Sequence, residues 1–278
     1  MLFHRTLRIP AATAVLALAV LGSAACSSMD PSSVTRELLT MSKEEAYAQG
    51  EALVAKRKYE LGRQYLRFVA ENYANDALGK QAALRLADSF FEEKTPLGYV
   101  EAQGRYKDFR SRYPSHPRSD YALFRLAQVS DRQAEKPDRD QANTRLAAQS
   151  YRELLQNYPG SPYTAEARAR YRSMLDLLAE HEFLVAQYYF RRSAWEASRT
   201  RFEGLFAAFP EYSRMEKALY WAGVTERRLG RDEDARALFE RLRRDYPQSP
   251  FLRKLPKPAE PPAAATASAA LGETPSLR

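Results

Sequence analysis

A short motif that ends in an aromatic residue followed by proline recurs along the chain and constrains its fold more than any other feature. The four clear copies read YKDFRSRYP, YRELLQNYP, FEGLFAAFP and FERLRRDYP, and LRFVAENYA is an earlier copy without the proline. The terminal aromatic residues are Tyr73, Tyr113, Tyr158, Phe209 and Tyr246, separated by 40, 45, 51 and 37 residues. A recurrence at this scale is typical of stacked repeats, each one a small supersecondary unit.

The last copy predicts how one unit folds. In KALYWAGVTERRLGRDEDARALFERLRRDYP, Gly223 lies where one helix presses on the next, and Gly230 lies in the turn between them. Ala235, Phe239 and Leu242 then form one apolar stripe. The separations exceed the tetratricopeptide (TPR) period of about 34 residues, so some helices must be longer or carry insertions. One hairpin cannot bury its own apolar face, and its neighbours must stack on it. We therefore predict an all-α fold, an α-solenoid of about five TPR-like hairpins over residues 43–252.

The N-terminus predicts export and lipidation. Arg5 and Arg8 precede an apolar run over residues 11–21 that is too short to span a bilayer, so residues 1–25 are expected to be a lipoprotein signal peptide. Cys26, the sole cysteine, follows small residues at the position of a lipobox and is predicted to be acylated. The lipobox is loose because Ser23 replaces the usual leucine, and an ordinary signal peptide with a chance cysteine is the alternative. Ser27 in place of aspartate fits delivery to the outer membrane.

Both flanks of the predicted solenoid are polar or of low complexity. Residues 26–42 are expected to be a lipidated N-terminus followed by a flexible tether. Residues 253–278, rich in proline and alanine, are expected to be disordered.

The charge and the rare reactive residues argue against nucleic-acid binding and catalysis. The formal net charge is +8, or +6 without the signal peptide, and basic residues alternate with acidic ones as in RDEDARALFERLRRDYP. Such a pattern is typical of solvated helices rather than of a phosphate-binding patch. His181-Glu182 lacks the second histidine of a zinc-protease helix, because position 185 is valine. We expect no metal, no cofactor, no nucleic-acid partner and no enzymatic activity.

Aromatic residues cluster in the first half of the chain more densely than repeat stacking requires. We expect some of them to line an inner groove that accepts an extended or helical peptide, with core packing as the alternative for each. These candidate groove residues are Tyr47, Phe90, Phe91, Tyr99, Tyr121 and Phe124.

Taken together, the lipobox cysteine and several segments resemble the BamD family, the TPR lipoproteins of the β-barrel assembly (Bam) machinery. The segments are YPSHPRSDYALFRLA, YPGSPYTAEA and LAEHEFLVAQYYFRRSAWEASRTRFEGL. The resemblance covers residues 26–252, and residues 178–205 carry its most specific part.

This resemblance implies a non-catalytic scaffold, anchored by lipid in the outer membrane of a Gram-negative bacterium and facing the periplasm, that helps to insert β-barrel proteins. The implied partners are a BamA-like barrel subunit, bound through its POTRA region, unfolded outer-membrane precursors and other Bam lipoproteins. The resemblance also implies that the N-terminal half recognises substrates and that the C-terminal half binds the barrel subunit. Arg201 matches a family arginine near that subunit, and Tyr188, Tyr189 and Trp195 match neighbouring positions, although helix packing explains the aromatic residues equally well.

Two other classes compete with this interpretation. Another TPR envelope lipoprotein, such as a pilotin-type factor for secretin assembly or a cell-envelope coordinator, would share the repeats. The segment HEFLVAQYYFRRSAWEASRTRFEG argues against it. An envelope hydrolase would need a paired nucleophile and base, which the sequence does not display.

Overall fold

The computed structural model describes residues 31–255. The chain divides into two compact units, residues 1–42 and 43–278. The predicted signal peptide, the lipidation site Cys26 and residues 256–278 of the predicted tail lie outside the described residues. Within residues 31–255, no helix has a stretch long and apolar enough to cross a membrane.

In its described part, residues 31–42, the first unit contains one helix, α1 (Pro31–Leu38), inside the segment that the sequence predicts as a flexible tether. The sequence did not predict this helix of eight residues, and the tether over residues 26–42 stays a prediction. Pro31 occupies the first helical position, where its fixed φ favours helix initiation. Val34 and Leu38 follow one turn apart and give the short helix an apolar side.

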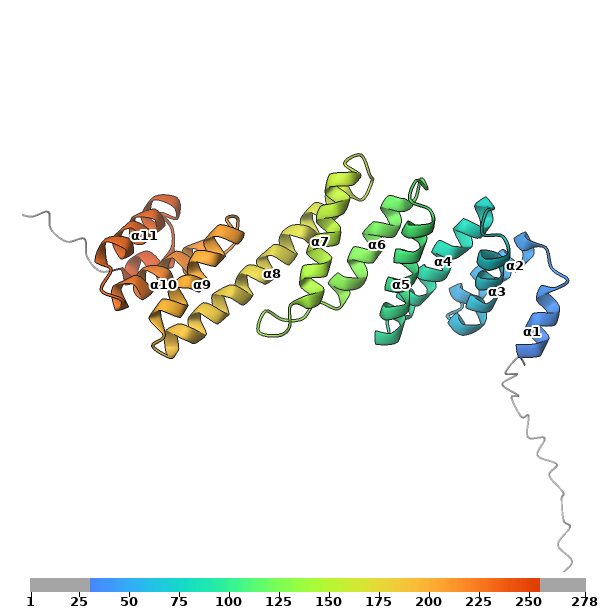
Figure 1. Cartoon of the computed structure of the whole chain (residues 1–278), viewed down its shortest axis with the longest axis horizontal. Helices are drawn as coiled ribbons and strands as arrows, with labels where there is room; N and C mark the ends of the chain where they lie inside the picture. Colours follow the sequence, from blue (N-terminus) through green and yellow to red (C-terminus); the bar gives the residue numbers. More distant parts are fainter. Residues whose placement is uncertain (1–30, 256–278) are drawn as a thin grey trace, which may run out of the picture. The chain divides into compact units, whose positions relative to one another are not determined.

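The second unit contains ten α-helices in its described part, and they form the five predicted hairpins, each with a first helix A and a second helix B (Figure 1). The hairpins are α2 (Lys43–Ala55) with α3 (Tyr59–Asn72), α4 (Ala77–Glu93) with α5 (Pro96–Arg112), α6 (Ser119–Arg132) with α7 (Ala142–Asn157), α8 (Thr164–Arg191) with α9 (Trp195–Ala208), and α10 (Met215–Arg228) with α11 (Asp232–Asp245). Each helix packs on the next one in the chain, and a short 3-10 helix, η1 (Pro250–Lys254), follows α11. The α-solenoid prediction is confirmed.

The B helices share one buried pattern, counted back from the terminal aromatic residue. A small residue lies eleven positions before it, a large one seven positions before it, and an apolar one four positions before it. The small residues are Gly62, Ala102, Ala147, Ser198 and Ala235. The large residues are Leu66, Tyr106, Tyr151, Phe202 and Phe239, and the apolar ones are Val69, Phe109, Leu154, Leu205 and Leu242. All fifteen are buried, and the contacts of Phe202 with Phe183 and of Phe239 with the face of Gly223 show that this stripe packs on the A helix of its own hairpin.

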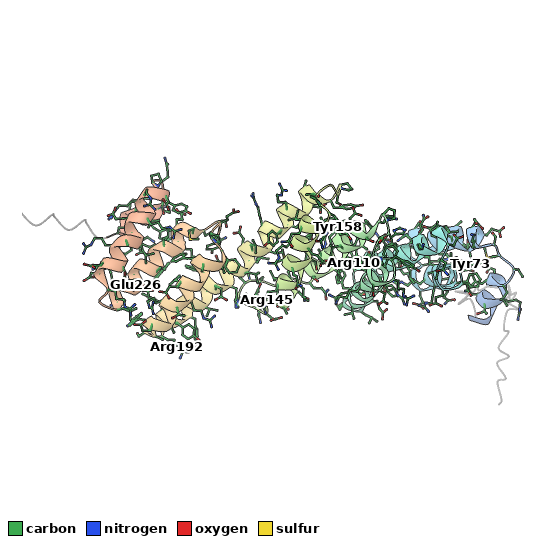
Figure 2. All side chains as sticks on the ribbon, turned by 45° about the horizontal axis from the view of Figure 1, so that its top comes forward. Tyr73, Arg110, Arg145, Tyr158, Arg192 and Glu226 are labelled. Atoms are coloured by element: carbon green, nitrogen blue, oxygen red, sulfur yellow. The ribbon has the colours of Figure 1, made fainter. Side chains whose placement is uncertain are left out.

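The terminal aromatic residues end the B helices in a common way. Each one is the C-cap, and its backbone N–H donates to the carbonyl four residues earlier. Where proline follows, the cap has ψ near 60°, as in Tyr158 at 58°. Tyr73 precedes alanine and has ψ of 36°, nearer to the helical region (both residues are labelled in Figure 2). Because proline excludes the preceding residue from the helical region, it sharpens each helix end.

The turns inside the hairpins use left-handed backbone conformations. Arg57, Lys94, Ser193 and Gly230 have φ between 57° and 75° in the first, second, fourth and fifth hairpins. The third hairpin instead has the longer insertion between Arg132 and Ala142 that the repeat spacing predicts.

Helix α8, with 28 residues, is twice as long as α9 and belongs to two hydrophobic cores. Ala167 and Met174 pack in the core formed by the first three hairpins. Ala179, Phe183 and Ala186 pack in a second core with α9, α10 and α11. One helix therefore connects an N-terminal half and a C-terminal half that have separate interiors.

Candidate partner-binding groove

A groove of about 590 Å³ lies between α8 and α9. Small residues on one side of α9 create it, because Ala197, Gly204 and Ala208 lie on the same face as Arg201, opposite the buried Phe202. A Cβ atom at Gly204 would meet no other atom within 4 Å, so this part of the groove is open. Glu182 and Tyr189 of α8 line the other wall.

Arg201 is the main polar group of this groove. Its side chain is 46% exposed, and Nη1 donates to Glu182 Oε2 at 3.2 Å. A guanidinium has five N–H donors in a planar fork, so this single hydrogen bond leaves donors for another acceptor. The groove can accordingly receive a carboxylate beside Arg201, in the geometry that favours paired charge-assisted hydrogen bonds.

The structure brings together some, but not all, of the aromatic residues predicted near Arg201. Tyr189 lines the same groove. Tyr188 is 48% exposed and lies beside Tyr189, with ring centroids 5.6 Å apart, and the Arg192 guanidinium lies over the Tyr188 ring, 5.3 Å from its centroid (Arg192 is labelled in Figure 2). These two tyrosines and Arg201 therefore form one continuous candidate surface.

Trp195 does not line this groove. Its ring packs edge-on against that of Phe190, with the ring centroids 4.9 Å apart. Phe190 in turn packs against Trp221 of α10, with the ring centroids 5.1 Å apart. These contacts join α8, α9 and α10, so the structure supports the packing alternative for Trp195.

Two further cavities along α8 were not predicted from the sequence. One of about 410 Å³ is lined by Tyr171, Leu175 and Phe209, and Phe209 also lines the Arg201 groove. Another of about 700 Å³ is lined by Pro137 of the insertion and by Glu180 and Tyr212. Both depend on segments that are distant in sequence meeting at α8. The 51-residue separation of Tyr158 and Phe209, the longest between two copies of the repeat motif, is the sequence signal for the long helix α8.

Two of the six predicted groove residues in the N-terminal half are core residues. Phe90 is 9% exposed, with the Arg63 guanidinium 3.8 Å from its ring centroid. Phe124 is 4% exposed and stacks on Tyr163 at 4.7 Å. The groove prediction is wrong for these two, because helix stacking buries both rings.

The other four candidate groove residues are half-buried and make contacts within the chain. Tyr47 accepts a hydrogen bond from Gln81, and Phe91 packs against Tyr99 at 5.7 Å. Tyr121 donates to Asp88 at 2.8 Å, and burial together with this carboxylate raises the pKa of its phenol. Arg125 lies over the Phe91 ring at 4.0 Å. The exposed surface at these positions is therefore a mixture of aromatic edges and bonded polar groups.

The two histidines of residues 31–255 contact the backbone. His181 Nδ1 lies 2.7 Å from the carbonyl oxygen of Pro137, which attaches the insertion to α8. His116 Nδ1 accepts a hydrogen bond from the Arg118 amide at 3.1 Å, in the turn between α5 and α6. Within residues 31–255, no three His, Cys, Asp or Glu side chains gather in a way that would hold a metal ion.

Comparison with known proteins identifies the family. Residues 39–242 match the model of the YfiO family, described as outer membrane lipoprotein. The outer membrane protein assembly factor BamD of Neisseria meningitidis serogroup A is 26% identical over 231 residues, which cover 80% of this chain and 85% of that protein. BamD of Haemophilus influenzae is 22% identical and covers 72% of this chain and 79% of its own length. Among solved structures, the TPR2AB domain of yeast Sti1 in complex with pHSP90 aligns with 74% of this chain and 78% of its own, with 11% identity and a TM-score of 0.41. The chain belongs to the YfiO family of outer membrane lipoproteins, the family of BamD.

Proposed function

We propose that this protein is a non-catalytic lipoprotein scaffold that helps to assemble and insert β-barrel proteins into the outer membrane. Acylated Cys26 would anchor it, with the solenoid facing the periplasm of a Gram-negative bacterium. Two acyl chains or more are needed for stable anchoring, and the lipoprotein class supplies them. The naming of its relatives as assembly factors supports the proposal.

The Arg201 groove carries the proposal. It combines a partly exposed guanidinium, a tyrosine wall and open space on one face of the C-terminal half. A POTRA region of a BamA-like barrel subunit would present a carboxylate to Arg201 and apolar surface to Tyr188 and Tyr189. Glu182 would hold the guanidinium in place before the partner arrives, which lowers the entropy lost on binding.

Barrel precursors would bind the N-terminal half, at the half-buried residues Tyr47, Phe91, Tyr99 and Tyr121. The scaffold would thus hold precursor and insertase on two separate halves connected by α8. Membrane anchoring and joint binding raise the effective concentration of each partner for the other, and no bond-making step is required. Other Bam lipoproteins would occupy further surfaces of the solenoid.

The experiment is copurification of the lipidated protein from its own outer membranes. Arg201→Glu should lower recovery of the POTRA-bearing barrel subunit about tenfold, because one charge-assisted contact becomes a like-charge contact. The matched control is Arg152→Glu on α7, which reverses an exposed charge outside the groove and should leave recovery unchanged.

Unchanged recovery with Arg201→Glu, in a variant that unfolds at the same temperature as the natural protein, would contradict the role of this groove. Recovery of a secretin in place of the barrel subunit would instead support the alternative of a pilotin-type assembly factor.

A further inference from the structure

A second groove, of about 300 Å³, lies among α9, α10 and α11. It lies apart from the Arg201 groove, and the two share no lining residue. Glu226, labelled in Figure 2, enters it from the last turn of α10.

Glu226 is a buried carboxylate with an unused acceptor. The residue is 7% exposed, and its Oε2 atom is buried with no hydrogen-bond partner in the described structure. Its backbone carbonyl accepts from the Leu229 and Arg231 amides, both at 3.0 Å, so the turn after α10 fixes its position. Since an unsatisfied buried carboxylate is costly, such a group in a folded protein calls for an explanation.

The nearby arginines are engaged by other acids. Arg199 donates to Glu196 at 2.9 Å and also pairs with Glu203, and Arg231 donates to Glu196 at 2.9 Å. Asp234 adds a further carboxylate to the groove. Four acidic side chains therefore surround two basic ones.

The pKa of Glu226 agrees with this charge balance. Burial raises it above the ordinary value for glutamate. Asp234 and Glu203 raise it further, while Arg231 and Arg199 lower it. The net result is a raised pKa, even though two guanidinium groups act to lower it.

The rest of the groove is apolar. Phe202, Phe206, Ala222 and Leu238 contribute to its lining, which suits an aliphatic stem better than a hydrated ion. An arginine side chain has such a stem and a planar head that bonds carboxylates with two donors at once.

We propose that this groove binds an arginine side chain from a partner protein, with its stem against the apolar lining and its guanidinium on Glu226. Asp234 and Glu203 at the margin would attract the cation, and the buried carboxylate would fix its position. A guanidinium also fits the site better than a metal ion, because within residues 31–255 no three acidic, histidine or cysteine groups converge to bind one.

The test uses N-acetyl-arginine amide as the probe, with N-acetyl-citrulline amide, its uncharged analogue, as the ligand control. Both are titrated into the methyl-labelled protein at constant ionic strength, and NMR follows the methyl groups of Ala222, Ala237 and Leu238. Arginine should cause saturable shifts and citrulline none. Glu226→Gln should weaken arginine binding about tenfold, and Asp234→Asn, an exposed substitution, should weaken it less.

Equal shifts with arginine and citrulline would overturn the proposal, as would unchanged arginine affinity in a folded Glu226→Gln variant. A lysine derivative that binds as tightly as arginine would overturn the preference for guanidinium. If Glu226 were only a structural residue, Glu226→Gln would alter the unfolding temperature while arginine still produced the same saturable shifts.

Discussion

The two halves of the solenoid differ in the residue type at one buried position of the B helices, seven residues before each terminal aromatic residue. In the second and third hairpins this position is a buried tyrosine, and in the fourth and fifth a buried phenylalanine. The hydroxyl of Tyr106 donates to Asp88, and that of Tyr151 donates to Asp131 at 2.9 Å. Each bond joins a B helix to the A helix of its own hairpin.

The phenylalanines lie in apolar surroundings. Phe202 packs against Phe183 at 6.0 Å, and Phe239 covers the face of Gly223 so closely that a Cβ there would lie 2.3 Å from its ring. A buried tyrosine requires an acceptor in place, whereas a buried phenylalanine requires only matching shape. At this position the second and third hairpins are therefore held by shape and by a polar bond, and the fourth and fifth by shape alone, as is the first with Leu66.

The largest effect expected is that of alanine at the close helix contacts. A Cβ at Gly79 would lie 1.8 Å from the Tyr73 carbonyl oxygen, which is backbone and cannot turn away. Gly79→Ala should therefore lower the free energy of unfolding by about 4 kcal/mol. Gly223→Ala should lower the free energy of unfolding by less, about 2 kcal/mol, because the Phe239 ring is a side chain and can shift. Urea denaturation followed by circular dichroism measures both.

Gly104→Ala is the control for these substitutions, since a Cβ there would meet no atom within 4 Å. It should stabilise the protein by about 1 kcal/mol, through helix propensity alone. If Gly79→Ala and Gly104→Ala changed the free energy of unfolding equally, the close approach of Gly79 in α4 to the Tyr73 carbonyl would be contradicted.

Exchanging the two aromatic types should have an intermediate effect. Phe202→Tyr would bury a hydroxyl in the apolar core of the C-terminal half, at a cost of about 2 kcal/mol. Tyr151→Phe would remove one hydrogen bond from Asp131, at a cost of about 1 kcal/mol. Amide hydrogen exchange localises the losses, which should lie in α9 for the first variant and in α7 for the second. If neither variant changed the free energy of unfolding, the difference between the two halves at this position would not contribute to stability.

The smallest effect is expected in alkaline solution. Burial and nearby carboxylates raise the pKa values of Tyr106, Tyr121 and Tyr151, so these phenols keep their protons in the folded state. In the unfolded chain they ionise near pH 10. The unfolded state then binds fewer protons, and stability falls as the pH rises above about 10. Tyr151→Phe should reduce this fall by about 1 kcal/mol at pH 11, measured by urea denaturation across the pH range. If Tyr151→Phe left the dependence of the free energy of unfolding on pH unchanged, the hydrogen bond from the Tyr151 phenol to Asp131 would be contradicted.

The structure brings together more of the candidate residues on α8 and α9 than of those in the N-terminal half. Arg201 and Tyr189 meet in one groove, because residues about one helix length apart in a hairpin face each other across it. Phe90 and Phe124 are core residues and not groove residues. An aromatic side chain on a helix that packs between two other helices can lie either in the core or at the surface. Spacing along one helix does not distinguish these outcomes.

The sequence by itself determined the five hairpins, their shared buried stripe and the sharp ends of most B helices. These features depend on local spacing and on the restricted backbone before proline, which the chain carries wherever it folds. Only the tertiary structure decided that Glu182 orients Arg201, that Asp88 and Asp131 satisfy buried tyrosines, and that Glu226 has an unused acceptor. These outcomes depend on which polar groups packing brings together from separate helices, and burial makes each pairing, or its absence, energetically significant.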